Sequence, residues 1–364
     1  MLSLSKAYAN DVKSDLALGL QALYNNTLTE SQIQEKIVKT LETKAKYNQL
    51  VAGFDPSKVT WKTGGGGAFQ EFQFASPIQI EGSKSNTVYG YLYTPNVSYD
   101  CNVKFPGTLL VHHVDDDISA QRKMALLAAQ QSKGIIMIIY LPEYGPRKTG
   151  NDSKASPFNG NLDDFKRGIF QSLVDLRVSY QVLKRVPKVD TNQMQIGGLS
   201  LGAALTATMA GYDPVFKYHL IGLGGGDYGA IMTSYNNGKE AGGAIKWALQ
   251  NVKSWKQEQV RDLLYDIDAF TWAHNARNSK MLFLAAKDDE IFNYDNNVMK
   301  LANIYQTNGN DVRVKTHAGE HVPDKDDLGI KTTIKVYWRV LTTILDFLGD
   351  SKSAEVSACN AQYN

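Results

Sequence analysis

Two different hydrophobic periods divide the chain. Between Phe69 and Tyr93, apolar and polar residues alternate with a period of two, in runs that end at Pro77 and Pro95. Such alternation predicts an antiparallel pair of half-buried strands. Farther along, short runs that are mostly apolar alternate with amphipathic stretches of helical period. This order predicts an α/β fold whose mostly parallel sheet is doubly wound, with helices on both faces.

The expected strands of the parallel sheet are short strand-like runs, at 108–111, 135–139, 194–196, 219–223, 281–284 and 312–315. The expected helices are the stretches of helical period between and after them, at 119–132, 164–185, 201–211, 293–307 and 331–348. Because helices separate most of the successive strands, we expect these strands to run parallel to one another.

Residues 10–50 precede this alternation and carry a different pattern. Apolar residues recur there at helical spacing, and Thr29 with Gln32 forms a capping-box pair before a second helix. The run from Gly64 to Gly67 follows. No strand is expected before these glycines and no Lys-Ser/Thr pair follows them, so a flexible loop is favoured over a phosphate-binding loop. The beginning of the chain is therefore predicted to be a helical extension.

The interval 228–278 also interrupts the alternation. It is longer than an ordinary crossover and has the pattern of two helices, at 244–252 and 257–264. We expect these helices to form an inserted cap over the strand ends. The predicted organisation is an N-terminal helical extension (1–60), a core in two parts (69–227 and 279–350) separated by the cap (228–278), and a C-terminal tail (351–364).

The charge balance excludes several classes of partner. The 364 residues include 39 Lys and Arg against 37 Asp and Glu, which leaves a net charge of +2 at pH 7. Such a balance does not predict a nucleic-acid partner or an anionic membrane surface. No apolar run approaches the roughly 20 residues that span a bilayer. We therefore expect a soluble enzyme or binding protein without a membrane span.

Cys101 and Cys359 are the two cysteines. They form either one disulfide that ties the tail to the body or two free thiols, and no Cys/His spacing resembles a zinc site. The beginning of the chain lacks the cationic and apolar segments of an intact signal peptide. The small-x-small triplet at 7–9 resembles the remnant of a cleavage site, so an exported mature form is slightly favoured over a cytoplasmic one.

One segment points directly to chemistry. Gly198-Leu199-Ser200-Leu201-Gly202 follows an expected strand and precedes a helix of small residues. A serine at the apex of such a turn has a strained backbone and an exposed hydroxyl, which is the nucleophile elbow of Gly-x-Ser-x-Gly hydrolases. The backbone N–H of Leu201, at the start of the helix, is placed to stabilise an oxyanion. Ser200 is therefore the candidate nucleophile.

A nucleophilic serine needs a histidine base and an acid that orients it. In the elbow-containing fold these follow the serine in the order acid, then histidine, each after a later strand. Asp288 and Asp289 follow the strand at 281–286, and His317 and His321 follow the strand at 312–316. The order fits either member of each pair.

These motifs resemble the α/β-hydrolase superfamily, and most of all its dienelactone-hydrolase, acetyl-esterase and prolyl-oligopeptidase-like branches. The resemblance covers about residues 88–348. The segments that carry it are 110–113, 174–177, 187–190, 198–202, 213–214, 289–292 and 319–321. No part of the family pattern matches the N-terminal helical extension.

The resemblance implies the roles of individual residues. It selects Ser200 as nucleophile, His321 as base and Asp289 as orienting acid, because Gly319-Glu320-His321 and Asp289-Glu290-Ile291-Phe292 match the family's loops. Leu201 is implied as one oxyanion donor. The second is expected near Val114, which stands where the family has glycine.

The strand 110–113 resembles the one that ends in the family's His-Gly oxyanion motif. His113 and Asp115 beside it are therefore candidate substrate-pocket residues, with a strand-end histidine bonded to backbone as the alternative for His112 and His113. The acidic run 115–117 lacks the spaced oxygen ligands of a cation site, so a solvated, helix-capping turn is favoured. No metal and no cofactor is expected.

The function that follows is hydrolysis of a carboxylic ester through an acyl-enzyme intermediate, with a small-molecule ester as the substrate. A serine peptidase that acts on short peptides is the alternative enzyme, because the same triad cleaves amides. A non-catalytic binding protein on a hydrolase fold is the alternative from another class. Acyl and alcohol specificity and oligomeric state depend on surfaces that these motifs do not describe.

Overall fold

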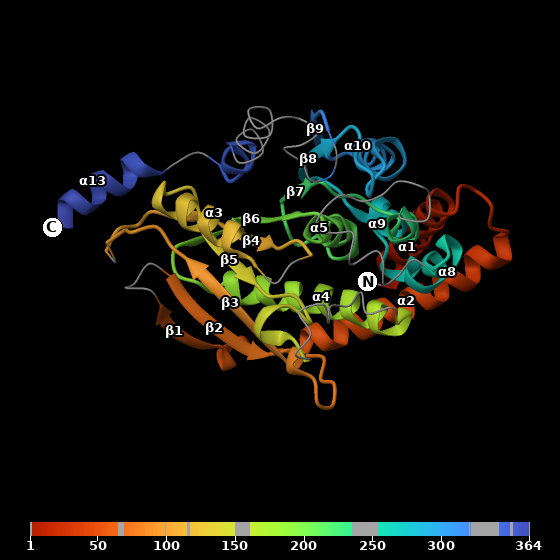
Figure 1. Cartoon of the computed structure of the whole chain (residues 1–364), viewed down its shortest axis with the longest axis horizontal. Coiled ribbons are helices and arrows are strands. Elements are labelled where there is room, and N and C mark those ends of the chain that lie inside the picture. Colours follow the sequence, from red (N-terminus) through yellow and green to blue (C-terminus); the bar gives the residue numbers. More distant parts are fainter. Residues whose placement is uncertain are drawn as a thin grey trace.

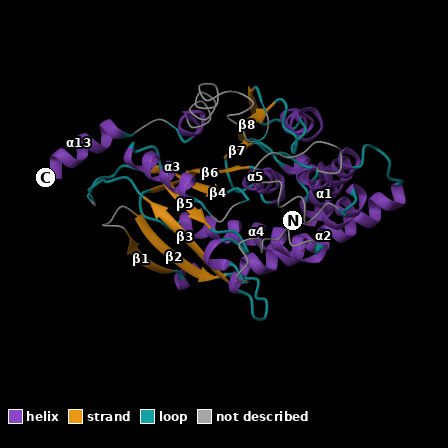
Figure 2. Ribbon diagram, in the orientation of Figure 1, coloured by secondary structure: helices purple, strands orange, loops and turns teal. Residues whose placement is uncertain are grey.

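The computed structural model describes residues 2–64, 69–98, 100–114, 117–149, 161–234, 254–319, 321, 342–349 and 352–363. Its strands form one sheet in the order β1-β2-β3-β5-β4-β6-β7-β8-β9 (Figures 1 and 2). The bounds of the strands are β1 (Thr60–Gly64), β2 (Phe69–Ala75), β3 (Thr87–Tyr93), β4 (Phe105–Val111), β5 (Ile135–Ile139), β6 (Val189–Leu199), β7 (Tyr218–Gly222), β8 (Lys280–Ala286) and β9 (Asp311–His317).

The sheet has an antiparallel edge and a parallel remainder. β2 pairs with β3 in antiparallel register, which confirms the pair expected from the period of two. β1, which the sequence analysis did not predict, extends this edge by pairing with β2. From β5 to β9 all neighbours are parallel, as predicted. Every residue of β4 and β5 is buried, whereas burial alternates along β2. The α/β fold class with a mostly parallel sheet is confirmed.

Helices cover both faces of the parallel strands. Alanines of α3 (Ser119–Gln130) pack with Ile136 and Ile138 on one face, where residues 344–348 join them. α4 (Leu162–Leu183) and α5 (Leu201–Tyr212) bury their apolar residues in the larger core on the other face. The helix expected at 293–307 begins as a π-helix (Tyr294–Met299) and continues as α10 (Lys300–Thr307). Residues 342–347 are helical, and the rest of the helix expected at 331–348 lies outside the described residues.

The N-terminal extension consists of α1 (Leu2–Leu23) and α2 (Glu30–Ala52). Thr29 and Gln32 form the predicted capping box, with the Thr29 N–H donating to Gln32 Oε1 at 2.8 Å. Leu16 and Leu20 of α1 are fully buried and belong to the larger core cluster, together with Ile37 of α2. The apolar stripes of the extension are thus covered by the body of the molecule.

The interval 228–278 is helical where it is described. It contains α6 (Tyr228–Thr233), α8 (Gln257–Leu264) and α9 (Ala269–Trp272). α8 has the bounds expected from the sequence, whereas the helix expected at 244–252 lies outside the described residues. α9 packs against α1 and α5, and α8 packs against α6 and α4. The assignment of the interval as a cap remains a prediction.

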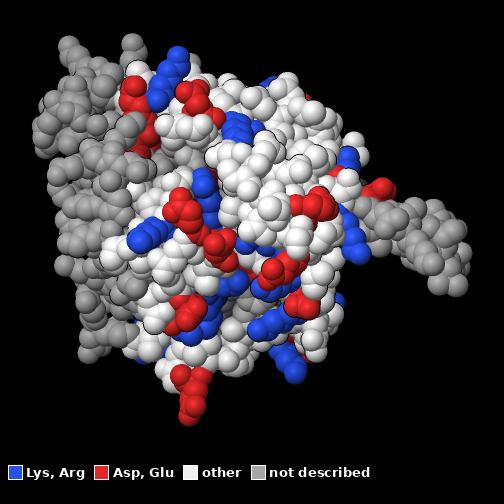
Figure 3. Space-filling model, turned by 90° about the vertical axis from the view of Figure 1, so that its right-hand side faces the viewer, with Lys and Arg blue, Asp and Glu red and all other residues white. Residues whose placement is uncertain are grey.

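Charged side chains of both signs mix on the face where α1, α2 and α8 lie (Figure 3). Several of them pair between elements that are far apart in sequence: Lys36 Nζ lies 2.8 Å from an Asp262 carboxylate oxygen, and Arg277 lies 2.7 Å from Asp15. Such exposed pairs are each worth about 1 kcal/mol or less. In the part of the chain that the structure describes, every helix is too short or too polar to span a lipid bilayer.

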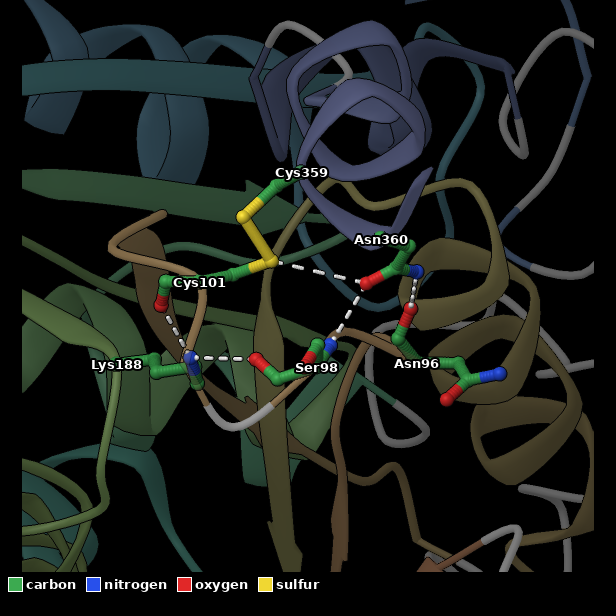
Figure 4. The surroundings of a disulfide bond; sticks show 6 residues. All are labelled: Asn96, Ser98, Cys101, Lys188, Cys359 and Asn360. Atoms are coloured by element: carbon green, nitrogen blue, oxygen red, sulfur yellow. Dashed lines mark hydrogen bonds between the residues drawn. A yellow bond between two sulfur atoms is a disulfide. The ribbon is translucent and has the colours of Figure 1, made fainter. Parts of the chain in front are cut away.

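The C-terminal helix α13 (Ser353–Tyr363) is tied to the body by a disulfide between Cys101 and Cys359 (Figure 4). Beside it, Asn360 Oδ1 accepts the Ser98 N–H at 2.7 Å. Lys188 Nζ donates to the carbonyls of Ser98 and Cys101. Of the two states that the sequence allowed for the cysteines, the structure has the disulfide.

Candidate active site

Ser200 occupies a sharp turn between β6 and α5. Its backbone has φ 54° and ψ −116°, a conformation that L-residues rarely adopt. Both glycines of the motif are needed for close approach. A Cβ on Gly198 would lie 2.3 Å from the backbone of Gly202, and a Cβ on Gly202 would lie 2.3 Å from the Val111 carbonyl oxygen. The Ser200 N–H donates to the Gly222 carbonyl at 2.9 Å, which anchors the turn to β7.

The structure brings Ser200, His321 and Asp289 together. His321 Nε2 lies 2.9 Å from Ser200 Oγ, and His321 Nδ1 lies 2.9 Å from Asp289 Oδ2. The carboxylate only accepts, so Nδ1 carries the proton and Nε2 is left to accept the serine hydroxyl. Relative exposure is 9% for Ser200, 4% for Asp289 and 1% for His321. The arrangement is that of a nucleophile, a general base and its orienting acid.

The loop after β8 holds Asp289 in position. Asp289 Oδ1 accepts the backbone N–H groups of Ile291 at 2.9 Å and Phe292 at 2.8 Å, which leaves Oδ2 for the histidine. Asp288 is exposed, and its carboxylate accepts the Gly319 N–H at 3.2 Å instead. The two adjacent carboxylates therefore have separate partners: Asp288 bonds Gly319, and Asp289 bonds His321.

Two residues that support the histidine had no role assigned from the sequence. Glu290 is buried, and its Oε2 accepts the backbone N–H of His321 at 2.9 Å. The ring of Phe292 stacks on the imidazole, with centroids 5.5 Å apart and an interplanar angle of 20°. Both lie in the loop after β8 that carries Asp289. Residue type alone does not reveal that these side chains contact the backbone and the ring of His321, which belongs to a distant loop. His317, the alternative base, points to the Ala318 carbonyl instead.

The proposed oxyanion donors lie beside Ser200 in the chain and in space. Leu201 is the first residue of α5, where helical geometry leaves the N–H groups without an intrahelical acceptor. Val114 is buried in the loop after β4. This loop starts against the first turn of α5, because a Cβ on Gly202 would also lie 2.7 Å from the His112 carbonyl oxygen. The roles of Leu201 and Val114 as donors remain predictions.

The remaining candidate residues lie in the segment after β4, and those that the structure describes have different surroundings. His112 is buried, and its ring bonds backbone through both nitrogens, with Nδ1 2.6 Å from the His113 oxygen and Nε2 accepting the Leu141 N–H at 2.9 Å. The His113 ring pairs with the Gln121 amide, and its place in a substrate pocket remains a prediction. Asp115 lies outside the described residues. Asp117, which lies just before the N-cap residue of α3, accepts the Ser119 N–H at 2.8 Å.

A polar cavity of about 360 Å³ adjoins the acid loop, with Asp289 and Glu290 in its wall. Arg261 and Asp227 form an ion pair there, with Nε 2.9 Å from Oδ1. Next to Asp227, burial and then the Asp227 carboxylate raise the pKa of Asp268 to about 6. Asp289 therefore borders polar surroundings. Within the described residues, no three His, Cys, Asp or Glu side chains are grouped so as to hold a metal ion.

The sequence and the fold of this chain can be compared with those of known proteins. No family model and no curated protein matches the sequence. Among solved structures, acetyl xylan esterase 1 from Thermoanaerobacterium sp. is similar with a TM-score of 0.57 at 15% identity, over 81% of this chain and 94% of the other. The acetyl xylan esterase from Paenibacillus sp. R4 gives 0.52 at 13%, over 82% and 92%. The chain has the α/β-hydrolase fold.

The α/β-hydrolase fold also occurs in a larger similar protein. The acylaminoacyl peptidase of Pyrococcus horikoshii matches with a TM-score of 0.52 at 17% identity, over 79% of this chain. This chain spans only 41% of the peptidase. In the α/β-hydrolase fold the nucleophile, acid and histidine follow one another along the chain in that order. Ser200 after β6, Asp289 after β8 and His321 after β9 keep this order.

Proposed function

We propose that the protein is a serine hydrolase that cleaves carboxylic esters. The observation that carries the proposal is the continuous chain of contacts from Ser200 Oγ through both nitrogens of His321 to Asp289, at 2.9 Å for each contact. The strained backbone of Ser200 supports it, because residues in such conformations cluster at functional sites. A binding protein on this fold would not need either feature, so catalysis is favoured over binding alone.

In the proposed mechanism, His321 Nε2 takes the proton of Ser200 as Oγ attacks the substrate carbonyl carbon. Asp289 holds the imidazole in the required tautomer and stabilises the imidazolium that forms. The N–H of Leu201, with one near Val114, stabilises the oxyanion, and loss of one such donor typically raises the barrier by about 3 kcal/mol. The imidazolium then protonates the leaving alcohol. Water, activated by His321, hydrolyses the acyl-enzyme and restores Ser200.

We favour esters over peptides as the substrate class because two of the similar solved structures are esterases. The two similar acetyl xylan esterases are matched over 94% and 92% of their own lengths. The acylaminoacyl peptidase is matched over 41% of its own length. A peptidase acting on short peptides is the second candidate, because the same triad can cleave an amide.

An exported form is part of the proposal. The disulfide between Cys101 and Cys359 supports it, because disulfides persist in oxidising compartments such as the periplasm or the cell exterior.

A fluorophosphonate probe tests the nucleophile. We expect the probe to label the wild-type chain at one serine. Ser200→Ala should abolish this label and lower the turnover of p-nitrophenyl esters by about 10⁴-fold or more. Ser172→Ala, at a buried serine of α4, serves as the matched control and is expected to keep the label. Labelling of Ser200→Ala at the wild-type rate would remove Ser200 from the mechanism.

The substrate class is tested with p-nitrophenyl esters of increasing acyl length beside aminoacyl p-nitroanilides. We expect kcat/KM to be higher for at least one ester than for every anilide. Preference for the anilides would favour the peptidase.

A further inference from the structure

A groove of about 470 Å³ lies over the antiparallel edge of the sheet. Side chains of β1, β2 and β3 line it, together with Tyr140 and Pro146 from the segment after β5. No residue of the proposed triad belongs to its wall. Its volume falls within the range of about 300–1,000 Å³ that is usual for small-molecule sites.

The register of the strands shows which side chains share the face of the groove. Lys62 pairs with Glu71, and Glu71 pairs with Tyr91, so these three side chains form one row across the sheet. Gln73 pairs with Tyr89 and forms a second row on the same face, two residues along each strand. Tyrosine rings on β3 therefore stand beside amide and charged groups on β1 and β2.

Tyr91 and Tyr140 are held in fixed positions. The Arg122 guanidinium lies 3.8 Å from the centroid of the Tyr91 ring, and the Tyr140 ring lies 6.1 Å away at 62°. Gly145, at φ 52°, lets the following loop lie directly on Tyr140, since a Cβ there would be 2.5 Å from the ring. Burial and the neighbouring Tyr91 phenol raise the pKa of Tyr140, so its hydroxyl stays protonated. The aromatic part of the wall is thus preorganised.

The chemistry of the wall defines its ligand. Lys62 and Glu71 contribute one charge of each sign, so the lining is neutral as a whole and complements an uncharged molecule. The apolar residues that line the groove include Trp61, Phe72 and Pro146, so the apolar part of the wall is aromatic or cyclic. Tyrosine offers an apolar face and a polar tip. A ligand that combines apolar faces with hydroxyl-bearing edges complements such a wall.

Sugar rings have that combination, with C–H groups on the faces and hydroxyls around the edges. We propose that this groove binds a short, neutral oligosaccharide, with sugar faces against Tyr89 and Tyr91 and hydroxyls hydrogen-bonded to Gln73 and Glu71. The site is separate from the proposed triad and does not depend on the proposed hydrolase activity. It is expected to remain intact in Ser200→Ala.

Calorimetric titration of the full chain tests the site, with cellotetraose, xylotetraose, mannotetraose and maltotetraose as probes. We expect saturable binding of at least one of them, by wild type and by Ser200→Ala alike. Gln73→Ala should raise the dissociation constant about fivefold, the equivalent of one lost hydrogen bond, and Tyr89→Ala about tenfold. Gln70→Ala is the matched control, because Gln70 is an exposed glutamine of the same strand on the opposite face.

Three results would overturn the proposal. One is that none of the four sugars binds saturably at concentrations up to about 10 mM. Another is equal affinity in wild type and Gln73→Ala; because Gln73 is exposed, that variant is expected to fold even where Tyr89→Ala does not. The third is that a neutral extended hexapeptide binds and none of the sugars does. This result would assign the groove to peptide binding at the sheet edge.

Discussion

β4 and β6 run side by side through the centre of the sheet, and their two ends are built in different ways. At the C-terminal ends lie Ser200, directly after β6, and the loop to Val114 after β4. At the N-terminal ends lie Cys101, shortly before β4, and Lys188, directly before β6. At the C-terminal ends, hydrogen bonds between side chains hold the loops together. At the N-terminal ends, a disulfide and the hydrogen bonds of one lysine hold them together.

Both ends contain a residue with positive φ, and the two residues use it differently. Ser200 has φ 54°, which directs its hydroxyl to His321. Lys188 has φ 67°, and its ammonium group bonds the Ser98 and Cys101 carbonyls. Strained backbone is kept only where the surrounding contacts hold it. At one end the strain presents the hydroxyl of the proposed nucleophile, and at the other it helps to fasten a loop.

The largest effect is expected at the proposed catalytic end. Asp289→Asn should lower ester turnover by about three to four orders of magnitude, because an amide there favours the wrong histidine tautomer. Asp288→Asn should lose less than about tenfold, since its carboxylate bonds Gly319 and not His321. Steady-state kinetics of both variants are the measurement. A greater loss in Asp288→Asn than in Asp289→Asn would contradict the assignment of the acid.

At the N-terminal ends of β4 and β6, we expect substitutions to change the free energy of unfolding and not the turnover. Replacing Cys101 and Cys359 together by serine should lower the free energy of unfolding by about 2–4 kcal/mol, because the unfolded chain loses a long cross-linked loop. Urea denaturation measures this change, and turnover at a temperature well below the midpoint should stay within about twofold. Equal stability of the double variant and wild type would show that the disulfide does not stabilise this end.

A smaller effect is expected one residue farther along α13. Asn360→Ala removes the acceptor of the Ser98 N–H and should lower the free energy of unfolding by about 1 kcal/mol. Gln362→Ala, at an exposed position of the same helix, is the control and should change it by less than about 0.5 kcal/mol. If the two variants were equally stable, the contact of Asn360 would contribute nothing beyond the disulfide.

The interior of the sheet was predictable from the sequence because its strands are buried on both faces. Short, mostly apolar runs such as those within β4, β5 and β8 are typical of parallel strands that helices cover on both faces. The order of Ser200, Asp289 and His321 was predictable because an elbow-containing fold fixes which strands their loops follow. Selection of Asp289 over Asp288 needed the family resemblance, since both have the same chemistry.

Other features had no signal in the sequence. All but the last residue of β1 are exposed, so its sequence Thr-Trp-Lys-Thr-Gly shows no buried face, and pairing with β2 alone makes it a strand. β6 begins five residues before the expected strand, at Val189, because its polar start pairs with β4. The contact of Glu290 with the His321 backbone arises only when two loops meet. These features depend on tertiary neighbours that local patterns do not encode.

The disulfide also makes most of the molecule one covalent ring. Cys101 and Cys359 are 258 residues apart in sequence, and Ser200, Asp289 and His321 all lie between them. A single proteolytic cut anywhere in that interval therefore leaves two pieces that remain joined. Such a nicked chain would migrate near its full mass in non-reducing electrophoresis and separate into fragments only after reduction.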